Sequence, residues 1–142
     1  MKNKFIFLEH MADVEFEAFG ESLEEVFEQA VLALQATLFT GKVQENIKKR
    51  VIAEGKDREQ LLANFLNELL FLFDAEQFLV ANVERIKIVE KDKRFQLTAE
   101  IQGDLSERYE IKTYVKAATY HGMKIAFDKK KNIWNARVVL DV

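Results

Sequence analysis

The chain has 142 residues, of which 49% are hydrophobic and 32% are charged, a composition typical of an ordinary globular protein. It contains no cysteine, which excludes disulfides, thiolate zinc sites and cysteine nucleophiles, and its two histidines argue against a histidine-rich zinc site. The net charge of −3, with acidic and basic residues mixed along the chain, argues against a wide basic surface for nucleic acid.

The N-terminal segment predicts two strands. The apolar run at residues 5–9 predicts a short buried strand, and it is too short for a signal peptide or a membrane span, so we expect a cytoplasmic protein without membrane contact. Alternation over residues 14–19 predicts a second, half-buried strand. Residues 11–13 then connect two extended segments.

Two helices are predicted by capping boxes that precede helically spaced apolar residues. Ser22 and Glu25 fit such a box, and the helix that follows should end before Gly41. Asp57 and Gln60 open the second helix in the same way. Its wide apolar stripe, which extends as far as residue 73, is typical of a helix that covers a sheet.

The remaining elements are strands, and they set the fold class. We expect them at residues 49–54, 83–90, 95–102, 109–119, 123–127 and 133–142, with polar turns at 91–94 and 128–132. This order lacks the regular alternation of a parallel α/β sheet. It predicts an α+β layered sandwich, in which two helices pack on a mainly antiparallel sheet. No linker or repeat interrupts the chain, so we expect a single domain over residues 1–142.

A carboxylate near each end of the chain is a candidate metal ligand. Period-two alternation puts Asp141 on the polar face of the last strand with Arg137, next to Val142, where the sequence stops. Asp13 follows the first strand. Oxygen ligands at opposite ends of a small domain suit a hard cation if the fold brings the termini together. The alternatives are a solvated Asp141 and an Asp13 that only caps a turn.

Four other side chains have two readings each. His10 and His121 are either hydrogen-bonded structural residues or groups that flank the metal end and touch a partner or a phosphate. Tyr120 either packs or forms a hydrogen bond, and it is a further possible contact to a partner or a phosphate. Lys116 is either a surface lysine or a cation that neutralises a phosphate. Phosphate-binding loops and a Gly-x-Ser-x-Gly nucleophile elbow are absent from the sequence.

These segments together resemble one protein family. The relevant stretches are His10-Met11-Ala12-Asp13-Val14, Leu72-Phe73-Asp74, residues 115–122 (VKAATYHG) and Leu140-Asp141-Val142. Their identity and order resemble the archease family over the whole chain. Two positions depart from the family pattern: Met11 replaces the usual threonine and Glu15 replaces the usual glycine. The first change removes a hydroxyl beside the expected site, and the second adds a negative charge near it.

The resemblance implies a function and a set of ligands. Archeases are non-catalytic activators of the guanylate-dependent RNA-splicing ligase of tRNA splicing, and they promote ligase guanylylation and multiple turnover. The resemblance assigns Asp13, Asp141 and Val142 to a divalent cation, with Ca²⁺ expected and Mg²⁺ or Mn²⁺ as alternatives. The expected partner is the ligase, with RNA contacted through it, and the expected state is a monomer or weak homo-oligomer.

Two other functions are open at the level of sequence. A general RNA-associated or chaperone-like binding module would use the basic runs at residues 48–50 and 129–131, or an exposed apolar surface. Neither run carries interleaved aromatic residues for base stacking. A metal-dependent hydrolase would need a general base, for which only the two histidines are candidates.

Overall fold

The structure is a computed structural model that describes residues 4–8 and 13–142. The strands are β1 (Phe5–Leu8), β2 (Val14–Gly20), β3 (Ile47–Gly55), β4 (Phe78–Lys91), β5 (Arg94–Leu105), β6 (Ala117–Ala118), β7 (Lys124–Asp128) and β8 (Ile133–Asp141). The helices are α1 (Leu23–Leu38), α2 (Arg58–Glu76) and a short 3₁₀ helix, η1 (Ser106–Arg108). No helix in the described part of the chain is long and apolar enough to cross a membrane.

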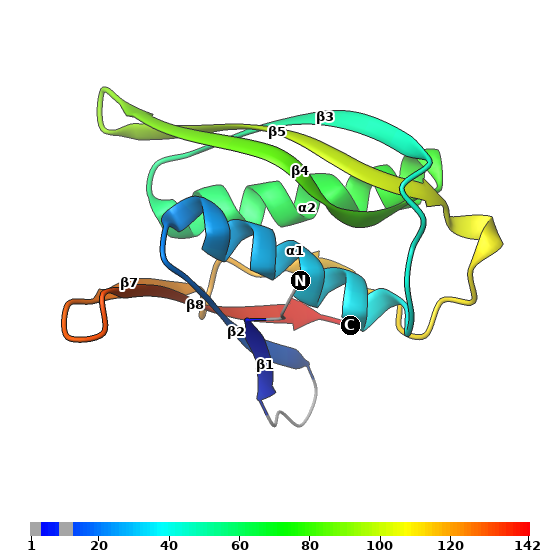
Figure 1. Cartoon of the computed structure of the whole chain (residues 1–142), viewed down its shortest axis with the longest axis horizontal. Coiled ribbons are helices and arrows are strands. Elements are labelled where there is room, and N and C mark those ends of the chain that lie inside the picture. The colour runs from blue at the N-terminus through cyan, green and yellow to red at the C-terminus, as the bar shows by residue number, and fades with distance from the viewer. Residues whose placement is uncertain (1–3, 9–12) are drawn as a thin grey trace.

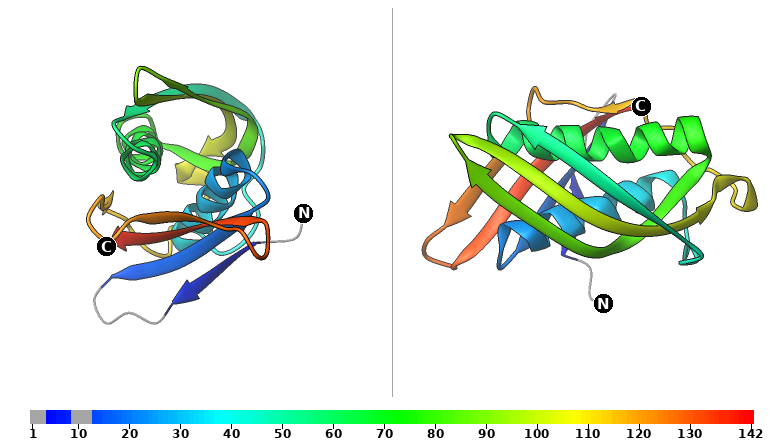
Figure 2. Two further views of the ribbon diagram at one scale, coloured as in Figure 1. Left: turned by 90° about the vertical axis from the view of Figure 1, so that its left-hand side faces the viewer. Right: turned by 90° about the horizontal axis from the view of Figure 1, so that it is seen from above.

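The strands form two separate antiparallel sheets with the helices between them. The first sheet has the order β1-β2-β8-β6, with β7 also paired to β8, and the second has the order β3-β5-β4. Figures 1 and 2 show α1 and α2 as a middle layer, with the first sheet below and the second above. The predicted α+β class, with helices packed on antiparallel sheet, is confirmed. The division of the strands into two sheets was not predicted.

The core fills both interfaces of this middle layer. Phe27 of α1 and Phe65 of α2 are fully buried, and their rings stack with centroids 6.2 Å apart. Burial extends to polar side chains of α1. Thr37 is buried and satisfies its hydroxyl by donating to the Ala33 carbonyl over 2.9 Å. A helix covered on two sides needs more than one apolar stripe, which explains the width of the stripe in α2.

Both predicted helix starts are confirmed by their caps. The Ser22 hydroxyl accepts from the Glu25 N–H over 3.1 Å, and the Asp57 carboxylate accepts from the Gln60 N–H over 2.7 Å. The end of α1 depends on a distant residue. Lys112 donates its main-chain N–H to the Leu38 carbonyl and its ammonium to the Ala36 carbonyl, at 2.8 and 3.1 Å. A cation from another segment therefore satisfies the carbonyl end of this helix.

Two sequence predictions are wrong in part. Strand β1 is not buried: Ile6 and Phe7 are about half exposed, because β1 is an edge strand that lacks a neighbour on one side among the described residues. The expected strand at residues 109–119 shrinks to Ala117–Ala118. The first part of this segment is an irregular connection. The Tyr109 hydroxyl fixes the start of the connection by donating a hydrogen bond to Asp104 over 2.7 Å.

Candidate metal-binding end of the first sheet

The two candidate aspartates lie at the same end of neighbouring strands. The antiparallel register of β2 and β8 pairs Val14 with Leu140, so Asp13 and Asp141 each lie one residue beyond this pair, at the same end of the two strands. Leu140 is fully buried and faces the helices. Asp141, one residue further, therefore lies on the outer face of the sheet. The fold thus brings residues 13 and 141 to the same end of the first sheet.

Strand β6 supports the end of β8. Ala117 pairs with Asp141, and the Lys116 N–H donates to the Asp141 carbonyl over 2.7 Å. Lys116 is exposed, and its main chain adjoins Asp141. Val142 is half-buried and packs against the core. Of the predicted contact residues in the described part of the chain, Lys116 is the one with a hydrogen bond to Asp141, through its main-chain N–H.

Tyr120 is bound elsewhere, at the beginning of α2. Its hydroxyl donates to the Asp57 carboxylate over 2.6 Å, and the Lys56 ammonium lies 5.4 Å from the centre of its ring. The hydrogen bond to Asp57 raises the pKa of Tyr120. Burial tends to raise the pKa of Asp57, but the hydrogen bonds from Tyr120 and the Gln60 N–H outweigh it, and the net pKa is lowered. His121 is exposed, and its carbonyl accepts from the Thr119 hydroxyl over 2.9 Å.

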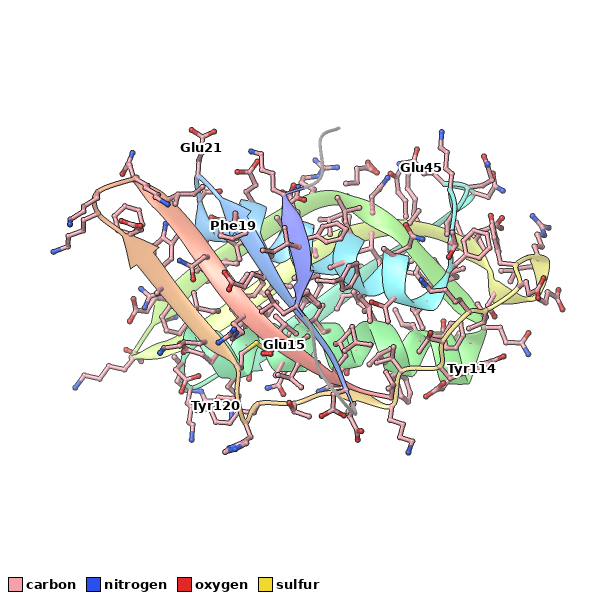
Figure 3. All side chains as sticks on the ribbon, turned by 90° about the horizontal axis from the view of Figure 1, so that it is seen from below. Glu15, Phe19, Glu21, Glu45, Tyr114 and Tyr120 are labelled. Carbon is pink, nitrogen blue, oxygen red and sulfur yellow. The ribbon has the colours of Figure 1, made fainter. Side chains whose placement is uncertain are left out.

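Glu15 has a counter-ion in the structure. Its carboxylate lies 3.4 Å from Arg137 Nε, across the β2–β8 pair. Figure 3 views the outer face of the first sheet, where Glu15 lies over β8. The extra charge at this position is therefore neutralised by Arg137. The sequence placed Arg137 and Asp141 on one strand face, but the pairing of β8 with β2 could not be read from it.

The donor chemistry of this end fits a hard cation. Asp13, Asp141 and main-chain oxygens are all oxygen ligands, which Ca²⁺ and Mg²⁺ prefer. Among the described residues, no group of three His, Cys, Asp or Glu side chains is close enough to hold a metal ion, so the described side chains supply two carboxylates at most. His10 and Met11, which the sequence placed beside this site, lie outside the described residues. An open groove of about 400 Å³ borders Asp13.

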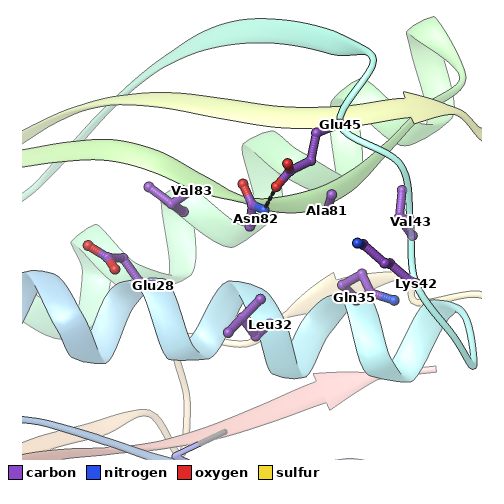
Figure 4. A pocket seen from close by; sticks show the side chains of 9 residues that line it. All are labelled: Glu28, Leu32, Gln35, Lys42, Val43, Glu45, Ala81, Asn82 and Val83. Atoms are coloured by element: carbon purple, nitrogen blue, oxygen red, sulfur yellow. Dashed lines mark hydrogen bonds between the residues drawn. The ribbon is translucent and has the colours of Figure 1, made fainter. Parts of the chain in front are cut away.

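A second hollow lies away from the aspartates, between α1 and β4. It measures about 230 Å³ and is shown in Figure 4. Asn82 donates to the Glu45 carboxylate at its edge, and the Asn82 amide oxygen is buried without a hydrogen-bond partner among the described atoms. Burial raises the pKa of Glu28, and the neighbouring Glu25 and Glu24 raise it further. Sequence reasoning did not indicate this hollow.

The comparisons with known proteins agree with these observations. The Archease protein family (MTH1598/TM1083) matches residues 5–142. The chain belongs to the archease family. It is 34% identical to protein archease of Methanosarcina mazei over 142 residues, which covers 98% of this chain and 96% of the relative. The family prediction made from the four sequence segments is confirmed.

Solved archease structures share the fold. The solution structure of Methanobacterium thermoautotrophicum protein 1598 matches with a TM-score of 0.82 and 35% identity, and covers 99% of this chain and 100% of that protein. A Thermotoga maritima crystal structure, described as an archease and possible chaperone, matches with a TM-score of 0.62 and 22% identity, over 95% of this chain and 94% of that one. The second likeness is one of fold alone.

Proposed function

We propose that this archease is a non-catalytic activator of a guanylate-dependent RNA-splicing ligase, and that its Asp13–Asp141 end carries a divalent cation to the ligase. The observation that supports the proposal is the register of β2 and β8, which brings the two aspartates to the same end of the sheet although they are far apart in sequence. The Lys116 main chain is bonded to Asp141 and anchors this end.

The proposal gives the residues at this end two roles, cation binding and phosphate pairing. Asp13, Asp141 and the main-chain oxygens of Val142 would hold Ca²⁺, or Mg²⁺ or Mn²⁺. When bound, such a cation neutralises charge on phosphoryl oxygens. Lys116, exposed beside Asp141, would pair with a phosphate of the ligase-bound nucleotide. Glu15, already paired with Arg137, is not a ligand in this scheme.

Guanylylation of the cognate ligase tests the proposal. The ligase is incubated with GTP, with and without this protein, across titrations of Ca²⁺, Mg²⁺ and Mn²⁺. Metal-dependent stimulation at substoichiometric protein is expected, with Asp13→Ala and Asp141→Ala both losing it. Asp74→Ala, an exposed aspartate of α2, is the matched control and should stimulate fully. Undiminished stimulation by both site variants would contradict the proposal.

One observation favours a chaperone-like binding module as a second candidate. The edge strand β1 exposes about half of Ile6 and Phe7, an apolar surface that such a module requires. The RNA-associated form of this candidate gains less support. Within the basic run at 48–50, Lys48 pairs with Glu84 and Lys49 with Glu76, at 3.1 and 2.6 Å, so two of its three charges are neutralised. Suppression of aggregation of a thermally unfolded ligase, lost in Phe7→Ser, would support the chaperone-like role.

A further inference from the structure

Strand β1 has an outer edge that no described strand covers. The Phe19 N–H donates to the Lys4 carbonyl over 2.8 Å, which fixes the direction of main-chain groups along β1. In an antiparallel ladder every second residue bonds to the partner strand. Because the main-chain carbonyl of Lys4 is directed toward β2, the main-chain groups of Ile6 are directed toward β2 as well. The N–H and C=O groups of Phe5 and Phe7 are directed outward, away from the sheet.

The side chains at this edge are apolar and exposed. Ile6 is 53% and Phe7 49% exposed, at consecutive positions of the same strand. Single exposed apolar residues are common, but proteins usually protect an open strand edge with charges, proline or a bulge. In the described part of this edge the only charge is Lys4, and it is already paired with Glu25 at 2.8 Å. The main-chain groups along this edge are therefore open to pairing with another strand.

A groove beside the edge offers room for apolar side chains. Two adjoining hollows of about 410 and 400 Å³ share Phe7 and Lys112 in their walls. The first is also lined by Phe5 and by the apolar side chains of Leu32, Ala36 and Phe39. The left view of Figure 2 shows β1 at the margin of the first sheet, beyond β2. An added strand would thus meet both open main-chain groups and a groove that combines these apolar side chains with Gln35, Thr40 and Lys112.

We propose that the strand that occupies this edge is β1 of a second copy of the chain, related by a twofold axis through Ile6. The outward main-chain groups belong to Phe5 and Phe7, which are symmetric about Ile6. In an antiparallel pair centred there, Phe5 of each copy lies opposite Phe7 of the other, and each outward N–H meets a carbonyl. The main-chain groups of this edge are therefore self-complementary about Ile6, which is what a twofold interface requires.

The side chains support the same register. Ile6 meets its own copy on the outer face of the joined sheet, which covers an apolar surface with an apolar surface. On the inner face, Phe7 of each copy lies opposite Phe5 of the other, beside the groove. Lys4 lies opposite Leu8, so within residues 4–8 no two like charges are brought face to face. The two five-stranded sheets become one continuous sheet across the axis.

The mass of the protein in solution tests the pairing. Light scattering and sedimentation should show the mass rising from 16.5 kDa toward twice that value as concentration increases from micromolar to millimolar. Ile6→Lys sets two ammonium groups face to face on the axis, and it should abolish the increase. Ile52→Lys is the matched control, because Ile52 is 56% exposed on β3, an edge strand of the second sheet. That control should associate like the unsubstituted chain, and circular dichroism should show that both variants fold.

Amide hydrogen exchange gives a second readout that depends on the main chain. The Phe5 and Phe7 amides should become protected as concentration rises, whereas the Ile6 amide, already directed to β2, should not change. A mass that stays at 16.5 kDa throughout the range overturns the proposal. So does association that survives Ile6→Lys, or protection of the Phe5 and Phe7 amides that does not depend on concentration.

Discussion

The side chain of Asn67 pairs with the main chain of Ala118 in both directions. Its amide N–H donates to the Ala118 carbonyl over 3.0 Å, and its amide oxygen accepts from the Ala118 N–H over 2.8 Å. A residue of α2 therefore takes the place of a neighbouring strand for β6. Because β6 pairs with the end of β8 at Asp141, this helix side chain helps to fix the candidate metal end.

Substitution of Asn67 should destabilise the protein. Asn67→Ala leaves the Ala118 N–H and carbonyl without partners, and we expect a loss of about 1–3 kcal/mol in the free energy of unfolding. Asn67→Asp keeps the shape but sets a carboxylate against the Ala118 carbonyl, so it should not recover the loss. Urea denaturation measures both. Asn64→Ala, on the same helix with one exposed bond to the Glu54 carbonyl, should cost less.

Metal binding should stabilise the folded protein through the two aspartates. Millimolar Ca²⁺ should raise the melting temperature of the unsubstituted chain, since a ligand that binds the native state shifts the unfolding equilibrium. Asp13→Asn and Asp141→Asn should each remove most of that increase. The reference variant is Asp74→Asn, in which the shift should persist. An equal Ca²⁺ shift in all three variants would place the cation elsewhere.

The bond between Tyr120 and Asp57 should appear in the pH dependence of stability. The pKa of Asp57 is lowered in the folded state, so its contribution is present above the ordinary aspartate range and is lost as pH falls through the lowered value. The pKa of Tyr120 is raised in the folded state, so its contribution to stability is present below the ordinary tyrosine range and is lost as pH rises through the raised value. Tyr120→Phe removes the hydroxyl.

The difference in stability between Tyr120→Phe and the unsubstituted chain should therefore be largest near neutral pH and narrow at both extremes. Thermal melts from pH 2 to pH 11 measure it. NMR titration of the Asp57 carboxyl should show its pKa rising in the variant. Tyr114→Phe, which alters an exposed tyrosine of the preceding connection, is expected to leave both measurements unchanged. An unaltered Asp57 pKa in Tyr120→Phe would show that the bond does not form in solution.

Glu28 should limit stability at neutral pH. Burial raises its pKa, so the folded state binds the proton more tightly and ionisation costs stability as pH rises from the ordinary glutamate range through the raised value. Glu28→Gln removes this cost. We expect a gain below about 1 kcal/mol at pH 7, because solvent screens a partly exposed group, and no gain near pH 3.

Denaturation of Glu28→Gln at the two pH values measures the effect. Glu68→Gln serves as the comparison, because Glu68 is exposed on α2 and is not among the groups that raise the pKa of Glu28. No gain is expected for that variant at either pH. Equal gains in Glu28→Gln at pH 7 and pH 3 would mean that the effect comes from packing and not from the charge.

Local signals in the sequence were enough to place most elements. A capping box acts within four residues, so Ser22 and Asp57 marked the helix starts without any tertiary information. The polar turn at residues 91–94 likewise forms locally, with Asp92 and Lys93 both at positive φ between β4 and β5. The strand prediction for residues 109–119 was wrong for most of the segment, because a strand pattern does not show whether a partner strand is available. Only Ala117–Ala118 pairs with another strand, β8.

The sequence by itself determined the archease family, the α+β class, the helix starts and the identity of the candidate ligands, since all of these rest on residue type and short-range spacing. The tertiary structure alone decided which strands are neighbours. Pairing of β2 with β8 brought Asp13 and Asp141 to the same end of the sheet and set Glu15 beside Arg137, and the position of β1 at the sheet margin exposed Ile6 and Phe7. Strand pairing joins residues far apart in the chain through main-chain groups that every residue carries, so the sequence pattern does not encode it locally.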